Sequence, residues 1–450
     1  MTDIVLIYPY FMPEGDKSLF RFPPLGLGYI ASYLMQYGIK VKIIDGTFQT
    51  ENEVIEQVHL MNPQIIGIQC ILGTERSAVR LAKALKQDSN LIIAGGPQAS
   101  VVPSKFLDCF DLVVIGEGEQ TMLEIIEAFG QNKTYHDISG VAFKEVDQAL
   151  YTSPRKSTTN LDSMPFPSRE LYPNDKYRAL SEKRYGYSIT SMITTRGCPF
   201  SCDYCSRAVA GSDYNERSID NVTDEIEQIL SLSYNRIWIA DDVFTLRKEY
   251  VIGICNEIIR RGLKFEWECL SRVDTFDAEV AGIMKKAGCM RIFFGIESGN
   301  DEILQIMKKR ITVDEATKAI VMAKETGLRV GAFFIIGYPG ETDETILRTI
   351  KFSNTLPLDY LSYTFPYPMP GTGLYEKVKD RLLARYWDAD VNEIAKHRLM
   401  FETDFSESKL KFALFKGLTQ FKMRKQGFRY IQIPYKIFER ATDIAFRIIR

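Results

Sequence analysis

The sequence has little charge imbalance, few cysteines and no long apolar run. Its 56 Lys+Arg and 58 Asp+Glu give a formal net charge of −2, so no global electrostatic argument favours a nucleic-acid-binding protein. Eight cysteines in 450 residues is far below the density of a secreted disulfide scaffold. No window approaches the roughly 18 apolar residues that a membrane span needs, and the apolar stretch within residues 1–10 is too short for a signal peptide. These absences predict a soluble, cytoplasmic protein, in whose reducing surroundings clustered thiols are more often metal ligands than disulfides.

The length and composition predict a globular chain of more than one domain. A length of 450 residues suggests two or three domains, and a hydrophobic content of 45% is enough to build their cores. We expect a first domain at 1–137, a linker at 138–185, a second domain at 186–380 and a mostly helical C-terminal region at 381–450. The linker is rich in Ser, Thr, Pro and charge, with a small hairpin expected at 140–151.

The N-terminal part of the chain alternates short β-branched or aliphatic runs with segments of helical apolar spacing. The expected strands are 4–7, 41–44, 65–68, 91–94 and 112–115, and the expected helices are 25–36, 51–61, 74–86 and 119–129. Strands that alternate with helices predict a doubly wound α/β fold, whose parallel sheet is covered on both faces and binds ligands at the carboxyl ends of its strands.

Small or acidic residues follow these strands. They form the segments Asp45-Gly46-Thr47, Cys70 to Thr74, Gly95-Gly96-Pro97 and Gly116-Glu117-Gly118-Glu119. Glycines at such positions let the backbone approach a ligand closely, because no Cβ stands in the way. Each glycine pair taken alone is equally explained by the conformation of a βα turn.

Three cysteines, Cys198, Cys202 and Cys205, are spaced CxxxCxxC directly after a strand-like run at 188–195. Thiolates are soft ligands that suit iron-sulfur clusters and zinc, and three of them can hold three corners of a 4Fe-4S cube with the fourth iron open. A structural zinc site usually has four protein ligands. The cysteine or histidine nearest to this motif in the sequence is His136 on the N-terminal side and Cys255 on the C-terminal side. The spacing therefore favours a cluster. We expect the other five cysteines to be buried for packing.

The chain after the cysteines continues the same alternation. Expected strands lie at 236–240, 265–270, 291–294, 330–336 and 360–365, and expected helices at 223–232, 249–261, 279–287, 302–307 and 313–326. With the strand before the cysteines there are six βα-type units, which are too few for a closed eight-strand barrel and fit a partial (β/α)6 barrel.

The cysteine motif, with Tyr204 just before its last cysteine, resembles the signature of radical S-adenosylmethionine (SAM) enzymes. In that family the open iron binds the amino and carboxylate groups of SAM, and an electron from the cluster cleaves SAM to a 5′-deoxyadenosyl radical. By resemblance, Asp241 would meet the methionyl ammonium, Arg272 its carboxylate, and Glu297-Ser298, next to Gly295, the ribose or neighbouring polar atoms. Each of these residues has an alternative role as a cap or loop-fixing group.

The first domain resembles the cobalamin-binding domain at the front of many radical SAM enzymes. The resemblance rests on Phe22 to Tyr29, Gly95-Gly96-Pro97 and Gly116-Glu117-Gly118-Glu119. Of these, it implies that Gly95, Gly96, Pro97, Gly116, Glu117 and Gly118 hold cobalamin. The DxHxxG signature of other cobalamin proteins is missing, and His59, the only histidine of the first domain before His136, lies in a helical stretch. The resemblance therefore implies cobalt without a histidine ligand from this domain.

The last fifty residues are basic, with 11 Lys+Arg against 5 Asp+Glu. Ile437, Phe438, Ala441, Ile444, Ala445 and Ile448 follow helical spacing. This pattern is typical of a helix that lies on an anionic membrane or holds an apolar substrate. It is equally typical of a helix that docks on the catalytic domain with its basic residues in solvent.

The resemblance implies a cobalamin-dependent radical SAM enzyme that places a methyl group on an unactivated carbon or phosphorus centre through methylcobalamin. The expected cofactors are a 4Fe-4S cluster, SAM and cobalamin, and the expected partners are a small-molecule or lipid-like substrate and a reductant protein such as flavodoxin or ferredoxin. Two alternatives stay open: an oxidative cyclase resembling the anaerobic magnesium-protoporphyrin ester cyclase, and a non-catalytic metal-binding module. The sequence identifies no substrate and no catalytic residue beyond these binding groups.

Overall fold

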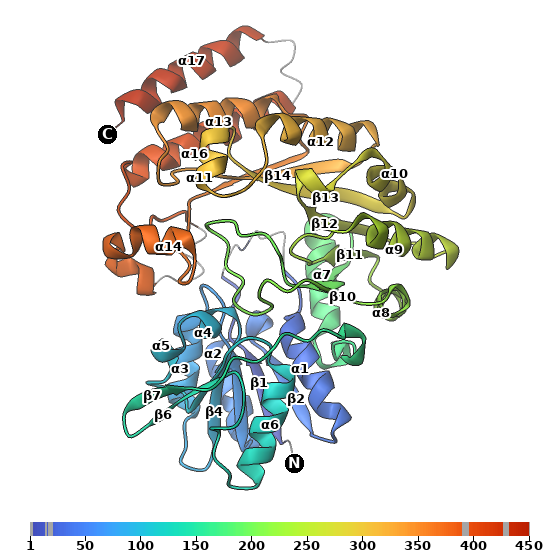
Figure 1. The fold of residues 1–450 in the computed structure, drawn as a ribbon, viewed down its shortest axis with the longest axis vertical. Coiled ribbons are helices and arrows are strands. Elements are labelled where there is room, and N and C mark those ends of the chain that lie inside the picture. The colour runs from blue at the N-terminus through green and yellow to red at the C-terminus, as the bar shows by residue number, and fades with distance from the viewer. Residues whose placement is uncertain (1–2, 14–15, 17–20, 389–395, 426–431, 450) are drawn as a thin grey trace. The chain divides into compact units, whose positions relative to one another are not determined.

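A computed structural model describes residues 3–13, 16, 21–388, 396–425 and 432–449 (Figure 1). Its internal contacts separate two units. One contains the chain up to Pro199 together with Arg207–Ile237, and the other contains Phe200–Ser206, Trp238–Trp387 and the described residues after 395.

The first unit is built on a seven-stranded sheet. Its strands are β1 (Ile4–Tyr8), β2 (Val41–Asp45), β3 (Ile65–Gln69), β4 (Leu91–Gly95), β5 (Leu112–Val114), β6 (Val141–Glu145) and β7 (Gln148–Tyr151), in the order β2-β1-β3-β4-β5-β6-β7. Strands β1 to β5 pair in parallel, so the predicted doubly wound core is confirmed. The hairpin expected within the linker instead joins this sheet, because β6 pairs antiparallel with β5 through Val113↔Ala142.

Helices bury both faces of this sheet (Figure 1). Helices α1 (Leu25–Gln36) and α6 (Glu119–Gly130) pack with Ile4 and Leu6 on one face. The opposite face carries α2 (Glu51–Met61), α3 (Glu75–Leu85), α4 (Pro97–Val101) and α5 (Pro103–Phe106), packed against Val5 and Ile7. Successive side chains of a strand point to opposite faces, which is why both sets of strand residues are apolar.

The segment expected to be an irregular linker contains a helix, α7 (Asn174–Tyr185). The last proline of the segment, Pro173, lies directly before the first turn of α7. At that position the missing N–H of a proline costs no helical hydrogen bond. The buried Tyr177 of α7 donates its hydroxyl to Asp45 Oδ2 at 2.6 Å, and Tyr172 donates to Pro24 O at 2.7 Å. These contacts fix the segment to the first unit, and proline content alone did not reveal them.

The second sheet has six strands and matches the predicted partial barrel. They are β8 (Ile189–Met192), β11 (Arg236–Ile239), β12 (Glu266–Ser271), β13 (Cys289–Glu297), β14 (Arg329–Ile335) and β15 (Tyr360–Thr364), in the order β15-β14-β13-β12-β11-β8. The intervening helices are α8 (Ile219–Ser231), α9 (Lys248–Arg260), α10 (Ala278–Lys286), α11 (Asp301–Ile306), α12 (Val313–Glu325) and α13 (Asp343–Thr355). Two short strands, β9 (Thr195–Arg196) and β10 (Asn215–Glu216), pair antiparallel on either side of the cysteine segment.

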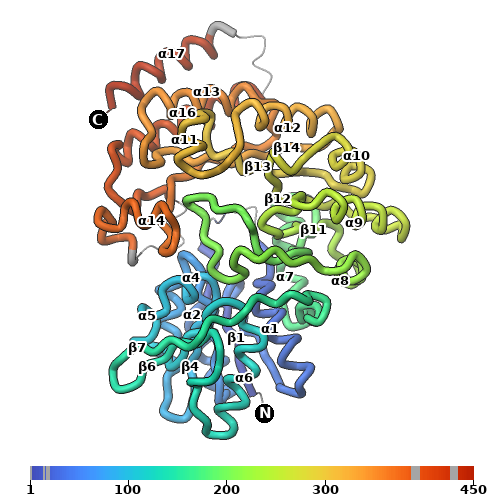
Figure 2. The backbone as a smooth tube through the Cα atoms, in the orientation of Figure 1, coloured from blue at the N-terminus to red at the C-terminus, as the bar shows by residue number. Residues whose placement is uncertain are grey.

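After the sheet, the described residues include the helices α14 (Gly373–Val378), α16 (Glu407–Lys425) and α17 (Gln432–Ile448). Helix α16 packs on α13 and β15, and α17 packs on α16 and α13 (Figure 2). Among the residues that the structure describes, no helix is both long and apolar enough to cross a membrane.

A buried charge network joins the chain before and after the cysteine segment within the first unit. Glu225 of α8 is fully buried and receives Arg169 Nη2 at 2.5 Å and, through its other oxygen, Arg217 Nη1. Arg169 also donates to Ser191 O at 2.9 Å, and Arg217 to Ile193 O at 2.8 Å. One carboxylate thus holds two cations that both reach the segment leading out of β8.

Replacing Glu225 by Ala is expected to lower the unfolding free energy by about 3–5 kcal/mol, because two buried guanidinium groups lose their counter-charge. Urea unfolding measures the loss. The control Glu51→Ala removes the partner of Arg80 in an exposed pair and should cost less than about 1 kcal/mol. Equal losses in the two variants would contradict the assigned role of Glu225.

Candidate active site

The cysteine segment begins at the end of β9, where the backbone is tightly packed. Gly197 has φ +85°, and a Cβ there would lie 2.1 Å from Asp213 O, so only glycine fits. The N–H of Cys198 donates to Gly211 O at 3.4 Å, and the N–H of Cys205 donates to Cys202 O at 3.2 Å. Cys198 and Cys202 are half-buried and Cys205 is exposed. The thiols therefore lie on a loop that its own backbone holds in shape.

The donor chemistry of this loop fits an iron-sulfur cluster. In the described parts of the chain, no three His, Cys, Asp or Glu side chains converge as ligands of a single metal ion. A 4Fe-4S cluster does not require ligands that converge on one ion, because each thiolate binds a different iron. Three thiols spaced along one loop meet that requirement.

Asp203, between the second and third cysteines, is an anchor that the sequence analysis missed. Its buried carboxylate accepts from Tyr338 Oη at 2.9 Å and from Lys377 Nζ at 2.6 Å, and pairs with Lys308 at 3.2 Å. Its backbone N–H donates to Met307 O. Burial opposes the ionisation of Asp203, yet the hydrogen bonds from Lys377, Tyr338 and Lys308 outweigh it and lower the pKa. In the sequence, only the position of Asp203 between two cysteines of the motif could have indicated this role.

Arg272 follows β12 and faces the same loop. Its Nη1 lies 3.7 Å from Cys202 Sγ, its guanidinium stacks on Phe200 at 3.7 Å, and its Nη2 donates to Lys309 O at 2.7 Å. Asp274 forms a two-point pair with it at 2.8 and 2.9 Å. A buried cation beside the thiol of Cys202 stabilises negative charge there.

The end of β13 brings Tyr204 and Glu297 together through Lys309, a residue that sequence reasoning did not single out. Lys309 Nζ donates to Glu297 Oε1 at 3.1 Å and to Tyr204 Oη at 3.2 Å. Burial, then the neighbouring Glu297 and Cys202, raise the pKa of Tyr204 well above its usual value. Glu297 has φ +76° at a bulge after Gly295, a strained conformation for a residue with a Cβ. Lys309 stands in a Lys-Lys-Arg run that reads as a solvated surface.

The other predicted SAM contacts are placed less directly. Asp241 follows β11 and is almost fully buried. The Ser298 hydroxyl is also buried; it accepts from the N–H of Asn300 at 3.2 Å and lies 3.2 Å from Thr349 Oγ1. It therefore fixes the loop before α11, and its contact with SAM stays a prediction.

The predicted cobalamin residues lie at the carboxyl ends of β4 and β5. Gly96 has φ +101°, and a Cβ there would lie 3.0 Å from Cys70 O, while Gly116 has φ +83°. Pro97 is the first residue of α4. Bare backbone at two adjacent strand ends fits close approach of a flat cofactor. His59 is exposed in the last turn of α2, away from the strand ends, as a surface residue would be.

The carboxylates of the second of these loops are already engaged. Glu117 Oε1 accepts from Arg196 Nη1 at 2.9 Å, and its Oε2 accepts from the N–H of Thr158 at 2.7 Å. Glu119, the first residue of α6, accepts from Arg196 Nη2 at 2.6 Å. Glu117 thus shapes the loop, the Gly116 N–H donates to Ser100 Oγ at 3.0 Å, and Gly118 O accepts from the N–H of Met122 at 2.9 Å.

The loop after β14 contains a second residue that sequence reasoning missed. Glu341 is buried and accepts from the N–H groups of Gly337 at 2.6 Å and Tyr338 at 2.9 Å. Burial raises its pKa from an ordinary 4.5 to about 8, despite these hydrogen bonds. Because Tyr338 also holds Asp203, the protonation of Glu341 affects a loop that supports the cysteine segment.

Glu341 should make the stability of the chain depend on pH. The folded state holds a proton that the unfolded state releases near 4.5, so this stabilising contribution is complete below pH 4.5 and is lost as the pH rises towards 8. We expect the difference in unfolding free energy between wild type and Glu341→Gln to fall with pH in that window, at up to about 1.4 kcal/mol per unit. Urea unfolding at several pH values measures it. Glu344→Gln, at an exposed carboxylate with a lowered pKa, should show no such fall, and a flat difference for Glu341→Gln would contradict the prediction.

Comparison with known proteins gives two family matches in one chain. Residues 192–353 match the Radical SAM superfamily, and residues 15–126 match the B12 binding domain. The chain is 36% identical over 364 residues to an uncharacterized methyltransferase of Pyrococcus horikoshii, covering 79% of this chain and 78% of that protein. It is 26% identical over 394 residues to the anaerobic magnesium-protoporphyrin IX monomethyl ester cyclase of Rubrivivax gelatinosus (84% and 70% covered). It is 25% identical over 410 residues to the cytidylyl-2-hydroxyethylphosphonate methyltransferase of Streptomyces wedmorensis (78% and 77%).

Two solved structures share the fold. The radical SAM methyltransferase TsrM from Kitasatospora setae, with cobalamin and a [4Fe-4S] cluster bound, matches with a TM-score of 0.71 at 18% identity, over 84% of this chain and 75% of that one. The cobalamin-dependent SAM radical enzyme OxsB, with aqua-cobalamin bound, matches with a TM-score of 0.77 at 17% identity, over 98% and 72%. The similarity to the Pyrococcus protein extends over most of both chains. This chain therefore belongs to the radical SAM superfamily, among the enzymes that join a B12-binding domain to a 4Fe-4S cluster and S-adenosylmethionine.

Proposed function

We propose that this enzyme methylates an unactivated carbon or phosphorus centre of a small molecule. The observation that carries the proposal is the presence, in one chain, of a B12-binding domain and a radical SAM domain, with extended similarity to methyltransferases. When bound, the cluster supplies the electron that cleaves SAM, and cobalamin carries the methyl group. Family membership removes the non-catalytic metal-binding alternative.

In this proposal the residues of the chain bind and orient the cofactors. Cys198, Cys202 and Cys205 hold the cluster. Arg272 orients the carboxylate of SAM through its Nη1, which lies beside Cys202 Sγ, because Asp274 already occupies its Nε and Nη2. The remaining SAM contacts are Tyr204, Asp241, Gly295, Glu297 and Ser298, and the cobalamin contacts are Gly95, Gly96, Pro97, Gly116, Glu117 and Gly118.

A labelled-methyl experiment tests the proposal without a known substrate. Anaerobically reconstituted protein with hydroxocobalamin, a strong reductant and methyl-labelled SAM should place label in the bound cobalamin and release 5′-deoxyadenosine. Cys202→Ala should lose bound iron and reduce deoxyadenosine to background, because one iron loses its thiolate. Cys109→Ala, at a half-buried cysteine outside the motif, is the matched control and should retain both. Absence of label from cobalamin in the wild type would refute methylation.

The similarity to the Rubrivivax ester cyclase supports a second candidate, oxidative ring formation without methyl transfer. The same experiment separates the two, since that chemistry releases deoxyadenosine while cobalamin stays unlabelled. Both candidates need an electron donor, for which a flavodoxin or ferredoxin is the expected partner. Both also place the protein in reducing surroundings such as the cytoplasm, where the thiols stay available.

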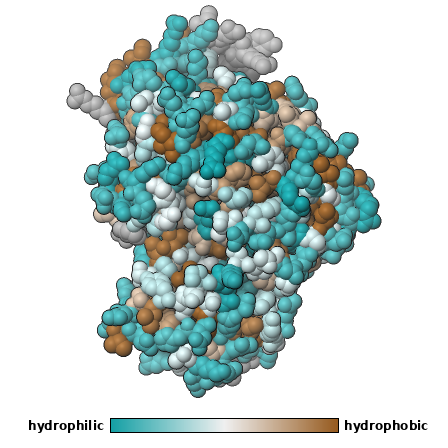
Figure 3. Space-filling view, in the orientation of Figure 1, coloured by the Kyte–Doolittle hydropathy of each residue, from teal (hydrophilic) through white to brown (hydrophobic). Residues whose placement is uncertain are grey.

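We also propose that α17 contacts an anionic membrane, which would give access to a lipid-like substrate. One face of the helix docks, because Phe446 is buried and Lys416 of α16 donates to Thr442 Oγ1 at 3.0 Å and pairs with Asp443 at 2.8 Å. The opposite face exposes Ile437, Ile444 and Ile448 by 62%, 61% and 72%, with Lys436 and Arg440 exposed beside them. Figure 3 shows hydrophobic and hydrophilic side chains intermixed where α17 lies. Isoleucines among basic residues match the boundary of an anionic lipid surface.

Vesicle sedimentation tests this contact with the full chain. We expect binding to vesicles that contain phosphatidylglycerol and weak binding to pure phosphatidylcholine, because the charge attraction is then missing. Ile444→Glu/Ile448→Glu should reduce the first by several-fold. The control Leu60→Glu, at an isolated exposed leucine of α2, should not. Equal binding by wild type and the double variant would remove the membrane contact.

A further inference from the structure

Arg196 connects two loops that the proposed function assigns to different cofactors. It is the last residue of β9 and stands two residues before Cys198. Its guanidinium bridges Glu117 at 2.9 Å and Glu119 at 2.6 Å, and all three side chains are largely buried. Glu117 lies between Gly116 and Gly118, the predicted cobalamin residues. One side chain therefore links that loop to the strand that enters the cluster loop.

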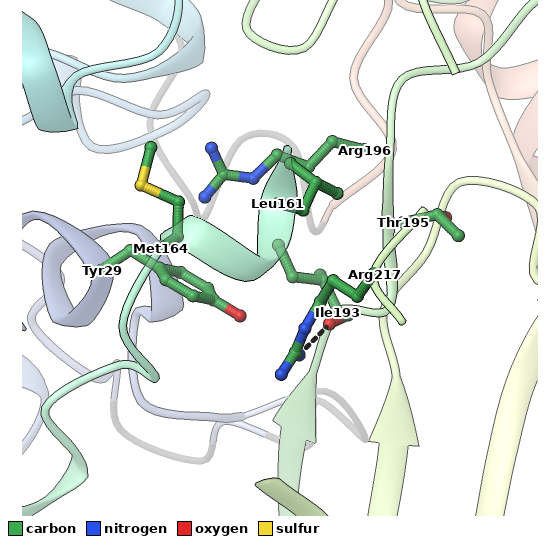
Figure 4. A pocket seen from close by; sticks show the side chains of 7 residues that line it. All are labelled: Tyr29, Leu161, Met164, Ile193, Thr195, Arg196 and Arg217. Atoms are coloured by element: carbon green, nitrogen blue, oxygen red, sulfur yellow. Dashed lines mark hydrogen bonds between the residues drawn. The ribbon is translucent and has the colours of Figure 1, made fainter. Parts of the chain in front are cut away.

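The surroundings leave this guanidinium little freedom. Tyr29 of α1 lies beneath it, with the ring centre 5.2 Å from Arg196 Cζ. Figure 4 shows Tyr29 and Arg196 around a small cavity, together with Leu161, Met164 and Arg217, whose bond to Ile193 is drawn. The cavity of about 10 Å³ has room for roughly one water molecule. A planar fork held by two carboxylates and an aromatic ring has one favoured orientation.

Only one residue separates Arg196 from Cys198 along the chain. Gly197 lies between them in a left-handed conformation, in close contact with Asp213 O. Cys198 in turn is tied to Gly211 through its backbone N–H. A shift of the Glu117 loop would thus act on the first cluster cysteine without a flexible segment to absorb it.

We propose that Arg196 is a positioning residue that couples occupancy of the cobalamin loop to the geometry of the first cluster cysteine. The inference rests on the proposed function for the identity of the two cofactors. Its energetic form is reciprocal: if the cluster favours the arrangement of the loop that binds cobalamin, cobalamin favours the arrangement that holds the cluster.

The coupling is measured as a ratio of two dissociation constants. Hydroxocobalamin is titrated into the full chain with and without its reconstituted cluster, and binding is followed by the absorbance of the corrin. In the wild type we expect cobalamin to bind the cluster-loaded protein more tightly by roughly 5-fold or more, the usual lower range of such couplings. In Arg196→Gln the ratio should fall close to one, because the link between the two loops is removed.

The matched control is Arg155→Gln. Arg155 is also a largely buried arginine of the same unit that reaches α6, where it pairs with Glu124 and donates to Thr121 Oγ1 at 2.7 Å, but it does not lead to the cysteines. This variant should keep the wild-type ratio. A purely structural role of Arg196 would lower stability or both affinities together and leave the ratio unchanged.

A conservative variant covers the case in which Arg196→Gln does not fold. Arg196→Lys keeps the charge but lacks the fork that reaches both carboxylates, so its ratio should lie well below that of the wild type. A wild-type ratio in either folded variant, or a wild-type ratio of one, would overturn the coupling alone. No binding of hydroxocobalamin to the wild type in either form would overturn the proposed function and this inference with it.

Discussion

Burial of both sheet faces is the constraint on which the rest of this structure depends. In the first unit, side chains that alternate along a strand, such as Ile4 and Val5, enter two separate apolar cores. Strands β1, β3, β4 and β5 are apolar along their length apart from the terminal Gln69, and polar groups follow where these strands end. Gly96, Gly116, Arg272 and Glu297 all occupy such ends. Because the parallel strands of a sheet end at one edge, the same constraint that buries each sheet also gathers the polar groups of that sheet.

The gathered groups are held by buried charges whose partners are in place. Lys309 donates hydrogen bonds to Glu297 and Tyr204, and Asp203 accepts them from Tyr338 and Lys377. Arg196 forms ion pairs with Glu117 and Glu119. A buried charge is costly unless it is paired, so each network permits few alternative arrangements. A binding site for reactive cofactors benefits from that rigidity, since the groups that meet the ligand need not reorganise.

Several polar side chains at the strand ends form hydrogen bonds to other groups of the protein. Both oxygens of Glu117 have internal partners, and the Ser298 hydroxyl serves the loop before α11. What these loops offer a ligand is the space beside Gly96 and Gly116, where no side chain stands, and, beside Cys202, the Nη1 side of the Arg272 guanidinium. The side chains that recognise a cofactor and those that shape its loop are thus neighbours in sequence with different tasks. Motif matching alone does not separate the two.

The sequence by itself determined the strands of both sheets and most of their helices, with α4, α5 and α13 as exceptions, because apolar periodicity is local and the turns after the strands carry glycine. It also singled out the three spaced cysteines as candidate cluster ligands, since a ligand set within one short loop needs no tertiary contact to be recognised. Only the tertiary structure decided that α7 forms on the first unit, that β6 extends its sheet, and that Arg196, Asp203, Lys309 and Glu341 support the candidate site. Lysines and carboxylates read as solvated surface in a sequence. Their burial and pairing arise when segments that are distant along the chain meet, as Arg196 meets Glu117.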